Sequence, residues 1–150
     1  MRYDFLVESY ASERLKVLSV WSEFRDDDLP VRPRPADPRG RSVHEHMVHQ
    51  CVSEDAWFRT MLGIDVGAPP LPEQERRLAF MQRYAEHSAS RLARLRDTDD
   101  AWWEAQTTFF PDSSRLITSL SICSSICGNG KNPVHSTQSA CIAMMASLSA

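Results

Sequence analysis

Three stretches of the chain repeat apolar side chains at the spacing of a helix, and long proline-containing connections separate them. In residues 3–25 the intervals alternate between four and three, as in a helix packed along a bundle. This stripe consists of Val7, Tyr10, Arg14, Val17, Trp21 and Phe24. Arg14 interrupts it, and we expect its stem to lie along the core while its charged head reaches water. With two further stretches of this kind, the sequence predicts an all-α fold.

The second helix is predicted over residues 43–62. Ser42 has the side chain of an N-cap, and Glu45 follows three residues later to complete a capping box. Gly63 provides a typical C-terminal stop. Apolar side chains spread around much of this helix, so we expect it to be contacted from more than one side. They are Val43, Met47, Val48, Cys51, Val52, Trp57, Phe58 and Met61.

The third helix has the most regular pattern. Its apolar stripe keeps the three-four spacing and consists of Leu78, Met81, Ala85, Ser88, Leu92 and Leu95. Glu73 and Glu75 are expected in its first turn, where a carboxylate complements the helix dipole. His87 falls one position off the stripe and is expected at the surface or its boundary. Asp97–Asp100 should cap a short segment whose Trp102-Trp103 pair plugs one end of the core.

Residues 30–41 hold four prolines and four arginines, which predicts a long extended loop between the first two helices. The arginines could mark a phosphate or nucleic-acid patch. The formal net charge of the whole chain is −3, however, and nucleic-acid binding usually requires an excess of basic residues. The sequence therefore favours a solvated Pro/Arg-rich loop and no nucleic-acid partner.

Composition is that of a globular protein, with 42% hydrophobic and 25% charged residues. A chain of 150 residues fits a single domain over residues 1–150. No apolar run reaches the roughly 18 residues of a membrane span, and the N-terminal residues lack a signal sequence. The four cysteines are expected to be thiols or metal ligands in a cytoplasmic protein.

The character of the chain changes after Asp112, which is its last acidic residue. Serine and cysteine become frequent, and the residues from Leu116 onward suit either a helix or a strand. Cys123, Cys127, His135 and Cys141 have the side chains that zinc prefers. Their spacing departs from the familiar short zinc motifs, so an independent zinc module is disfavoured.

Three histidines, His44, His46 and His49, fall within six positions of the second predicted helix. His46 and His49 are three residues apart and can share a face, whereas His44 points elsewhere. Glu45 lies four residues before His49, so it could support that histidine or bind a metal beside it. The alternative is that all three are polar residues at the start of a helix.

Residues 42–58 resemble the second helix of the DinB-like (DinB/YfiT) family. In that family a histidine is followed five positions later by glutamate and then by aromatic residues, which here are His49, Glu54, Trp57 and Phe58. The likeness extends over about residues 3–112 and is moderately specific. It implies a four-helix bundle, with residues from about 114 onward in the place of the fourth helix.

The resemblance also implies a divalent metal ion, zinc or nickel, held by three histidines. One belongs to the second helix and two to an HxxxH pair in the fourth. His49 matches the first of these ligands, and His135, followed by Gln138, matches the last. Lys131 stands where the remaining histidine is expected, and a protonated lysine is a poor ligand. We expect residues 114–150 to be either a divergent fourth helix or a frame-shifted tail.

The function implied by the resemblance is thiol-dependent group transfer. Family members include transferases and isomerases that use bacillithiol, mycothiol or glutathione on small electrophilic substrates, and many form homodimers. On this reading Glu45 or Glu54 could orient a ligand or move a proton. The alternative is a non-catalytic, stress-associated helical bundle with an incomplete metal site. The family name records induction by DNA damage and does not indicate DNA binding.

Overall fold

The computed structural model describes residues 2–34, 40–108 and 116–118, and most of their secondary structure is helical. The elements are α1 (Asp4–Ser22), η1 (Asp26–Asp28), α2 (Val43–Leu62), α3 (Arg77–Arg96), α4 (Asp100–Glu104), β1 (Gln106–Thr108) and β2 (Leu116–Thr118). The predicted all-α class is confirmed, since the only strands in the described part of the chain are three residues long. None of the described helices is long and apolar enough to cross a membrane.

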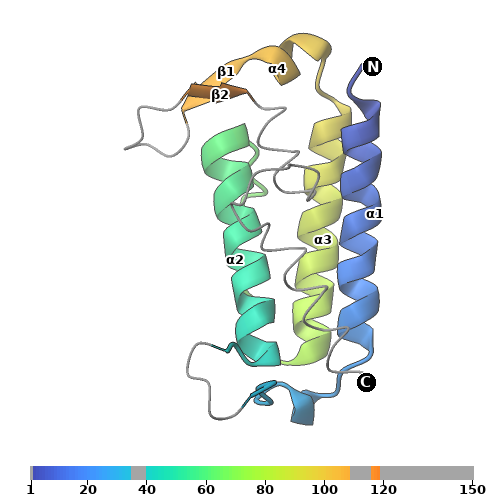
Figure 1. Ribbon diagram of the computed structural model, residues 1–150, viewed down its shortest axis with the longest axis vertical. Helices are drawn as coiled ribbons and strands as arrows, with labels where there is room; N and C mark the ends of the chain where they lie inside the picture. Colours follow the sequence, from blue (N-terminus) through green and yellow to red (C-terminus); the bar gives the residue numbers. More distant parts are fainter. Residues whose placement is uncertain (1, 35–39, 109–115, 119–150) are drawn as a thin grey trace.

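Three long helices form the body of the molecule (Figure 1). Helices α2 and α3 run in the same direction and α1 runs opposite to both, with α1 packed most closely against α3. The connection of residues 63–76 therefore returns along the length of the bundle. It is held to α3 by Arg83, which donates to the carbonyl of Pro69 at 3.1 Å.

Helix α2 begins and ends where the sequence predicts. The Ser42 side chain accepts from the backbone N–H of Glu45 at 3.2 Å, and the Glu45 carboxylate accepts from the N–H of Ser42 at 2.7 Å. This reciprocal pair satisfies two N–H groups that a helix start otherwise leaves without partners. Gly63 ends the helix with φ of 66°, a left-handed conformation that glycine adopts without strain.

The apolar core consists of two clusters stacked along the bundle. The first contains Tyr3, Leu6, Val7, Tyr10, Phe58, Met61, Leu62, Ile64, Leu92, Leu95 and Trp103. The second contains Val17, Trp21, Leu29, Val43, Met47, Cys51, Phe80 and Tyr84. Trp103 closes the end of the first cluster against Tyr3, with ring centroids 5.8 Å apart. The predicted plug is therefore confirmed for Trp103, and the predicted cap of its helix is Asp99, which accepts from the N–H of Trp102.

The predictions for α3 were partly wrong. The helix begins at Arg77, so Glu73 and Glu75 precede it, and Leu78 of the expected stripe is 64% exposed. A carboxylate remote in sequence caps this start, because Asp26 of η1 accepts from the N–H of Arg77 at 2.8 Å. The predicted Ser88, Leu92 and Leu95 are confirmed as buried. The rest of the buried face consists of Phe80, Tyr84, His87 and Arg91.

Two polar side chains that were expected to reach water are turned toward the bundle. His87, predicted at the surface or its boundary, is buried. The guanidinium of Arg14 donates to the hydroxyl of Ser88 at 3.0 Å and to the carbonyl of Ala85 at 3.3 Å. These bonds join α1 to α3, which explains why Arg14 can occupy a position in the apolar stripe.

The last described residues form a small antiparallel ladder. Gln106 pairs with Thr118, Thr107 with Ile117 and Thr108 with Leu116. The expectation of a fourth helix from about residue 114 is therefore wrong for residues 116–118, where pairing with β1 holds the chain in a strand. The rest of that expectation falls on residues 114–115 and 119–150, which lie outside the described residues.

Candidate functional site

His49, the first predicted metal ligand, has one ring nitrogen within hydrogen-bond distance of another α2 side chain. Its Nδ1 lies 3.0 Å from the Ser53 hydroxyl, one helical turn further along α2. Its Nε2 is buried and has no hydrogen-bond partner among the described residues. Burial lowers the pKa of His49, and the positive charge of Arg41 lowers it further. His49 is therefore held as a neutral imidazole, the form that binds metals.

A shallow groove of about 290 Å³ runs along the same side of α2. It is lined by His44, Glu45, Val48, His49 and Val52. His44, Val48 and Val52 are four residues apart and so lie in one row along the helix. The groove is polar at the His44 and Glu45 end and apolar toward Val48 and Val52, and Val52 is 40% exposed. An apolar group of modest size would fit beside His49 here.

The other two histidines of α2 are engaged differently. His44 Nε2 lies 2.5 Å from a carboxylate oxygen of Glu75, and its ring meets Phe80 edge-on at 5.6 Å between centroids. His46 is buried and faces inward, which differs from the expected polar residue at a helix start. Burial lowers the pKa of His46 as well. The structure therefore separates the roles of three histidines that the sequence places together.

Glu45 does not support His49 in the way the sequence suggested. Its carboxylate caps α2 and accepts from the Arg32 guanidinium at 2.6 Å. The backbone N–H of Ser42 and the charge of Arg32 lower the pKa of Glu45. Arg32 comes from the Pro/Arg-rich loop, so at least one arginine of that loop has a partner within the protein. Glu45 thus lines the groove as a carboxylate that is already paired.

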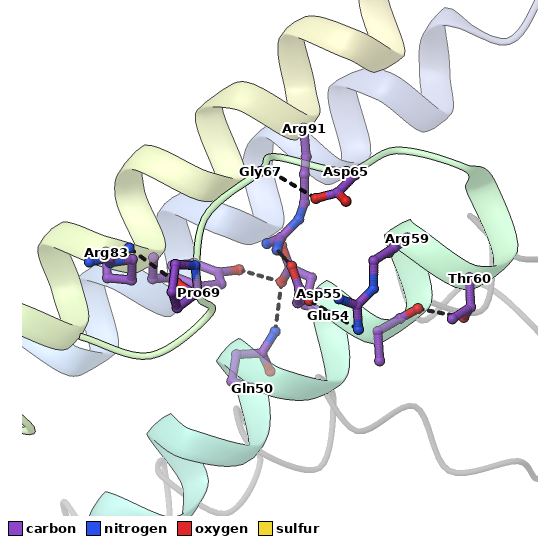
Figure 2. Close-up of polar contacts among 12 residues, drawn as sticks. Gln50, Glu54, Asp55, Arg59, Thr60, Asp65, Gly67, Pro69, Arg83 and Arg91 are labelled. Carbon is purple, nitrogen blue, oxygen red and sulfur yellow. Dashed lines mark hydrogen bonds and ion pairs between the residues drawn. The ribbon is translucent and has the colours of Figure 1, made fainter. Parts of the chain in front are cut away.

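Glu54 is the centre of a buried polar network that joins all three long helices. Figure 2 shows part of this network, with Gln50 of α2 and Arg91 of α3 beside Glu54. Its Oε1 accepts from the Tyr10 hydroxyl at 2.5 Å and from Arg91 at 3.2 Å. Its Oε2 accepts from Gln50 at 2.9 Å and from the Tyr84 hydroxyl at 3.0 Å. Four donors on one carboxylate fill its acceptor positions. Glu54 is therefore occupied as a structural anchor, and no bond to His49 is seen among the described residues.

Arg91 completes this network from α3. One terminal nitrogen binds Glu54 and the other binds Asp55 at 3.0 Å (Figure 2). The guanidinium also lies over the Phe58 ring, 5.4 Å from its centroid. The Arg91 and Glu54 side chains are each only 2% exposed. The network lies where the two apolar clusters meet, since Tyr10 belongs to the first and Tyr84 to the second. The hydrogen bonds of this network therefore fix the axial position of each helix relative to the other two.

The described residues do not by themselves form a metal site. They include no group of three or more His, Cys, Asp or Glu side chains arranged to hold a metal ion. His135 and Lys131 lie outside the described residues, as do Cys123, Cys127 and Cys141. No family model, curated protein or solved structure matches the chain. The resemblance to the DinB-like family and the ligand role of His135 stay predictions.

One buried thiol and two buried phenols should make the stability of this core sensitive to alkaline pH. Burial and the negative charge of Glu54 raise the pKa of Cys51 to about 12 and hold those of Tyr10 and Tyr84 well above the usual value. Above a pH of about 8.5 an unfolded chain releases these protons first, so the unfolded state is favoured as pH rises. We expect the free energy of unfolding, measured with urea, to fall steadily between pH 8.5 and 10.5.

A Cys51→Ala variant provides the control for this pH dependence. Removing the thiol should make the decline between pH 8.5 and 9.5 shallower, by up to about 1.4 kcal/mol per pH unit. The decline near pH 10, where free tyrosines ionise, should persist. A free energy of unfolding that stays constant from pH 7 to 10.5 would show that these three groups ionise as readily in the folded protein as in the unfolded chain.

Proposed function

We propose that this protein binds a divalent metal ion, zinc or nickel, with Nε2 of His49 as a ligand. The observation that carries the proposal is that Nε2 is buried with no hydrogen-bond partner in the described part of the chain, while Nδ1 lies beside the Ser53 hydroxyl. A buried polar atom without a partner is costly to a folded protein and usually has a functional reason. A metal ion would use the nitrogen lone pair, and a neutral imidazole suits zinc and nickel.

The remaining ligands in this proposal come from the part of the chain that the structure does not describe. His135 is the second ligand, and residues after 118 complete the bundle as a fourth helix. Because Lys131 replaces a ligand, the metal keeps positions open to water or to another small molecule. The donor set of this chain thus fits a metal that is exposed to its substrate.

The chemistry that we propose for the site is thiol-dependent group transfer. A metal ion of this type favours the thiolate of a low-molecular-weight thiol, and the thiolate is the nucleophile. In the groove, Val48 and Val52 offer apolar surface beside His49, where the carbon skeleton of a small electrophile could lie. Glu45 and Arg32 form a charged pair at the same groove and would orient polar groups of either reactant.

A non-catalytic helical bundle is the second candidate, and one observation favours it. Glu54, the most deeply buried carboxylate of α2, is fully used by Tyr10, Gln50, Tyr84 and Arg91. It is therefore not available to move protons in a reaction. In this case the protein would keep the fold and bind metal weakly or not at all.

Metal analysis of the purified protein separates these candidates. The metal-binding proposal predicts about one zinc or nickel ion per chain by mass spectrometry of the metal, with loss of that ion in His49→Ala and in His135→Ala. His44→Ala is the matched control, since His44 lines the same groove but is engaged by Glu75, and it should retain the metal. A wild-type protein that takes up no zinc or nickel after purification and reloading would support the non-catalytic bundle.

A further inference from the structure

We infer that Ser53 is a positioning residue that sets the tautomer of His49, and so decides which ring nitrogen carries a lone pair. The inference deepens the proposed metal function and rests on it for its purpose. Ser53 follows His49 by four residues on α2, so the two side chains lie one above the other on the helix surface. The hydroxyl lies 3.0 Å from Nδ1, which is a good hydrogen-bond distance.

Two arrangements of protons are compatible with this distance. In the first, the hydroxyl donates to Nδ1, which places the ring proton on Nε2. In the second, Nδ1–H donates to the hydroxyl oxygen, which leaves a bare lone pair on Nε2. The surroundings of Nε2 tolerate one of these two tautomers better than the other, and this difference selects between them.

The burial of Nε2 favours the second arrangement. Nε2 is buried and no described residue forms a hydrogen bond with it, so a proton there would be an N–H donor without an acceptor among them. Such buried donors are rarer in native proteins than acceptors without a donor. Ser53 is only half-buried, so its own hydroxyl proton can be donated to water. His49 is therefore protonated on Nδ1, with its Nε2 lone pair directed away from Ser53.

This tautomer is the one that a metal ion requires at Nε2. Metal-binding histidines commonly donate their other ring N–H to an oxygen, which fixes both the tautomer and the ring orientation. Free imidazole side chains prefer the proton on Nε2, so the acceptor at position 53 works against that preference. Ala at this position would remove the acceptor, whereas Thr would keep it.

Nitrogen NMR of the metal-free full-length protein, labelled at histidine, tests the inference directly. Long-range ¹H–¹⁵N correlations distinguish protonated from unprotonated ring nitrogens, and the signal missing in His49→Gln identifies His49. We expect Nδ1 protonated and Nε2 unprotonated in the wild-type protein and in Ser53→Thr. In Ser53→Ala the proton should move to Nε2, while the circular dichroism spectrum and the thermal unfolding midpoint remain close to wild type.

Zinc affinity, measured by competition with a chromophoric chelator, gives a second readout. Ser53→Ala should bind zinc about 10–100-fold more weakly than wild type, and Ser53→Thr should restore most of that loss. A wild-type His49 protonated on Nε2, or an unchanged tautomer in Ser53→Ala, would overturn the inference whatever the metal content. A wild-type protein with the expected tautomer that takes up no zinc would instead contradict the metal function alone.

Discussion

Replacing Arg91 with methionine should lower the free energy of unfolding by about 3–5 kcal/mol, the usual result of removing one partner from a buried ion pair. The guanidinium is the only positive charge that the structure shows in contact with Glu54 within the described residues. Methionine fills a similar volume but leaves the buried Glu54 carboxylate without its cation, and leaves Asp55 with only the more distant Arg59. The loss would be a large fraction of the roughly 5–15 kcal/mol that stabilises a typical domain.

Arg59→Met is the matched control for this experiment. Arg59 also faces Asp55, but its side chain is 56% exposed and the two charged groups are 3.8 Å apart. Exposed pairs of this kind contribute only about 0–1 kcal/mol. Urea unfolding of both variants at neutral pH should therefore show a large loss for Arg91→Met and a small one for Arg59→Met. Similar small losses in both would mean that the network does not anchor the three helices.

The second large effect is expected at the end of the bundle, where Trp103→Ala should cost about 3–5 kcal/mol. The Trp103 side chain is fully buried and packs from α4 against Tyr3, the residue that precedes α1. Its removal opens a cavity that no neighbouring backbone can fill without shifting the short α4 helix. The midpoint of urea unfolding reports this loss.

Trp102→Ala is the neighbouring control. The Trp102 ring meets Trp103 edge-on with centroids 5.0 Å apart, but Trp102 itself is only partly buried against the same cluster. Its removal should lower the free energy of unfolding clearly less than Trp103→Ala. If Trp102→Ala proved as damaging as Trp103→Ala, the closure of the core would have to be assigned to both rings together.

The sequence predicted the start of α2 correctly because that start depends on residues that are close together in the chain. Ser42 and Glu45 are three residues apart, and their mutual hydrogen bonds require no other part of the fold. The start of α3 was predicted too early because its capping carboxylate, Asp26, lies 51 residues away. A cap supplied across the fold leaves no local signal in the sequence.

The buried network was missed because apolar periodicity treats charged side chains as exposed. On α3 the residues Phe80, Tyr84, His87 and Arg91 keep the same three-four spacing as the predicted apolar stripe. The polar groups of Tyr84 and Arg91 can be buried because Glu54 and Asp55 of α2 accept hydrogen bonds from them. Gln50 and Glu54, four residues apart on α2, were the available signal for a polar row facing inward.

For the candidate site, the sequence singled out His49 but not its partner. Helical spacing favoured Glu45, which is four residues before His49, and overlooked Ser53, which is four residues after it. The capping role of Ser42 fixes Glu45 elsewhere, and this competition decides which neighbour reaches the imidazole. Whether His135 joins His49 depends on residues 119–150, where sequence patterning is weakest.

The most direct test of the central claim is anomalous X-ray diffraction from crystals of the zinc- or nickel-loaded protein, collected on both sides of the metal absorption edge. The proposal predicts one anomalous peak per chain at about 2.0–2.1 Å from Nε2 of His49, the usual distance for a metal–imidazole bond. The peak should vanish in crystals of His49→Ala. A metal peak bound elsewhere, or a His49 that makes no metal contact in loaded crystals, would contradict the proposal.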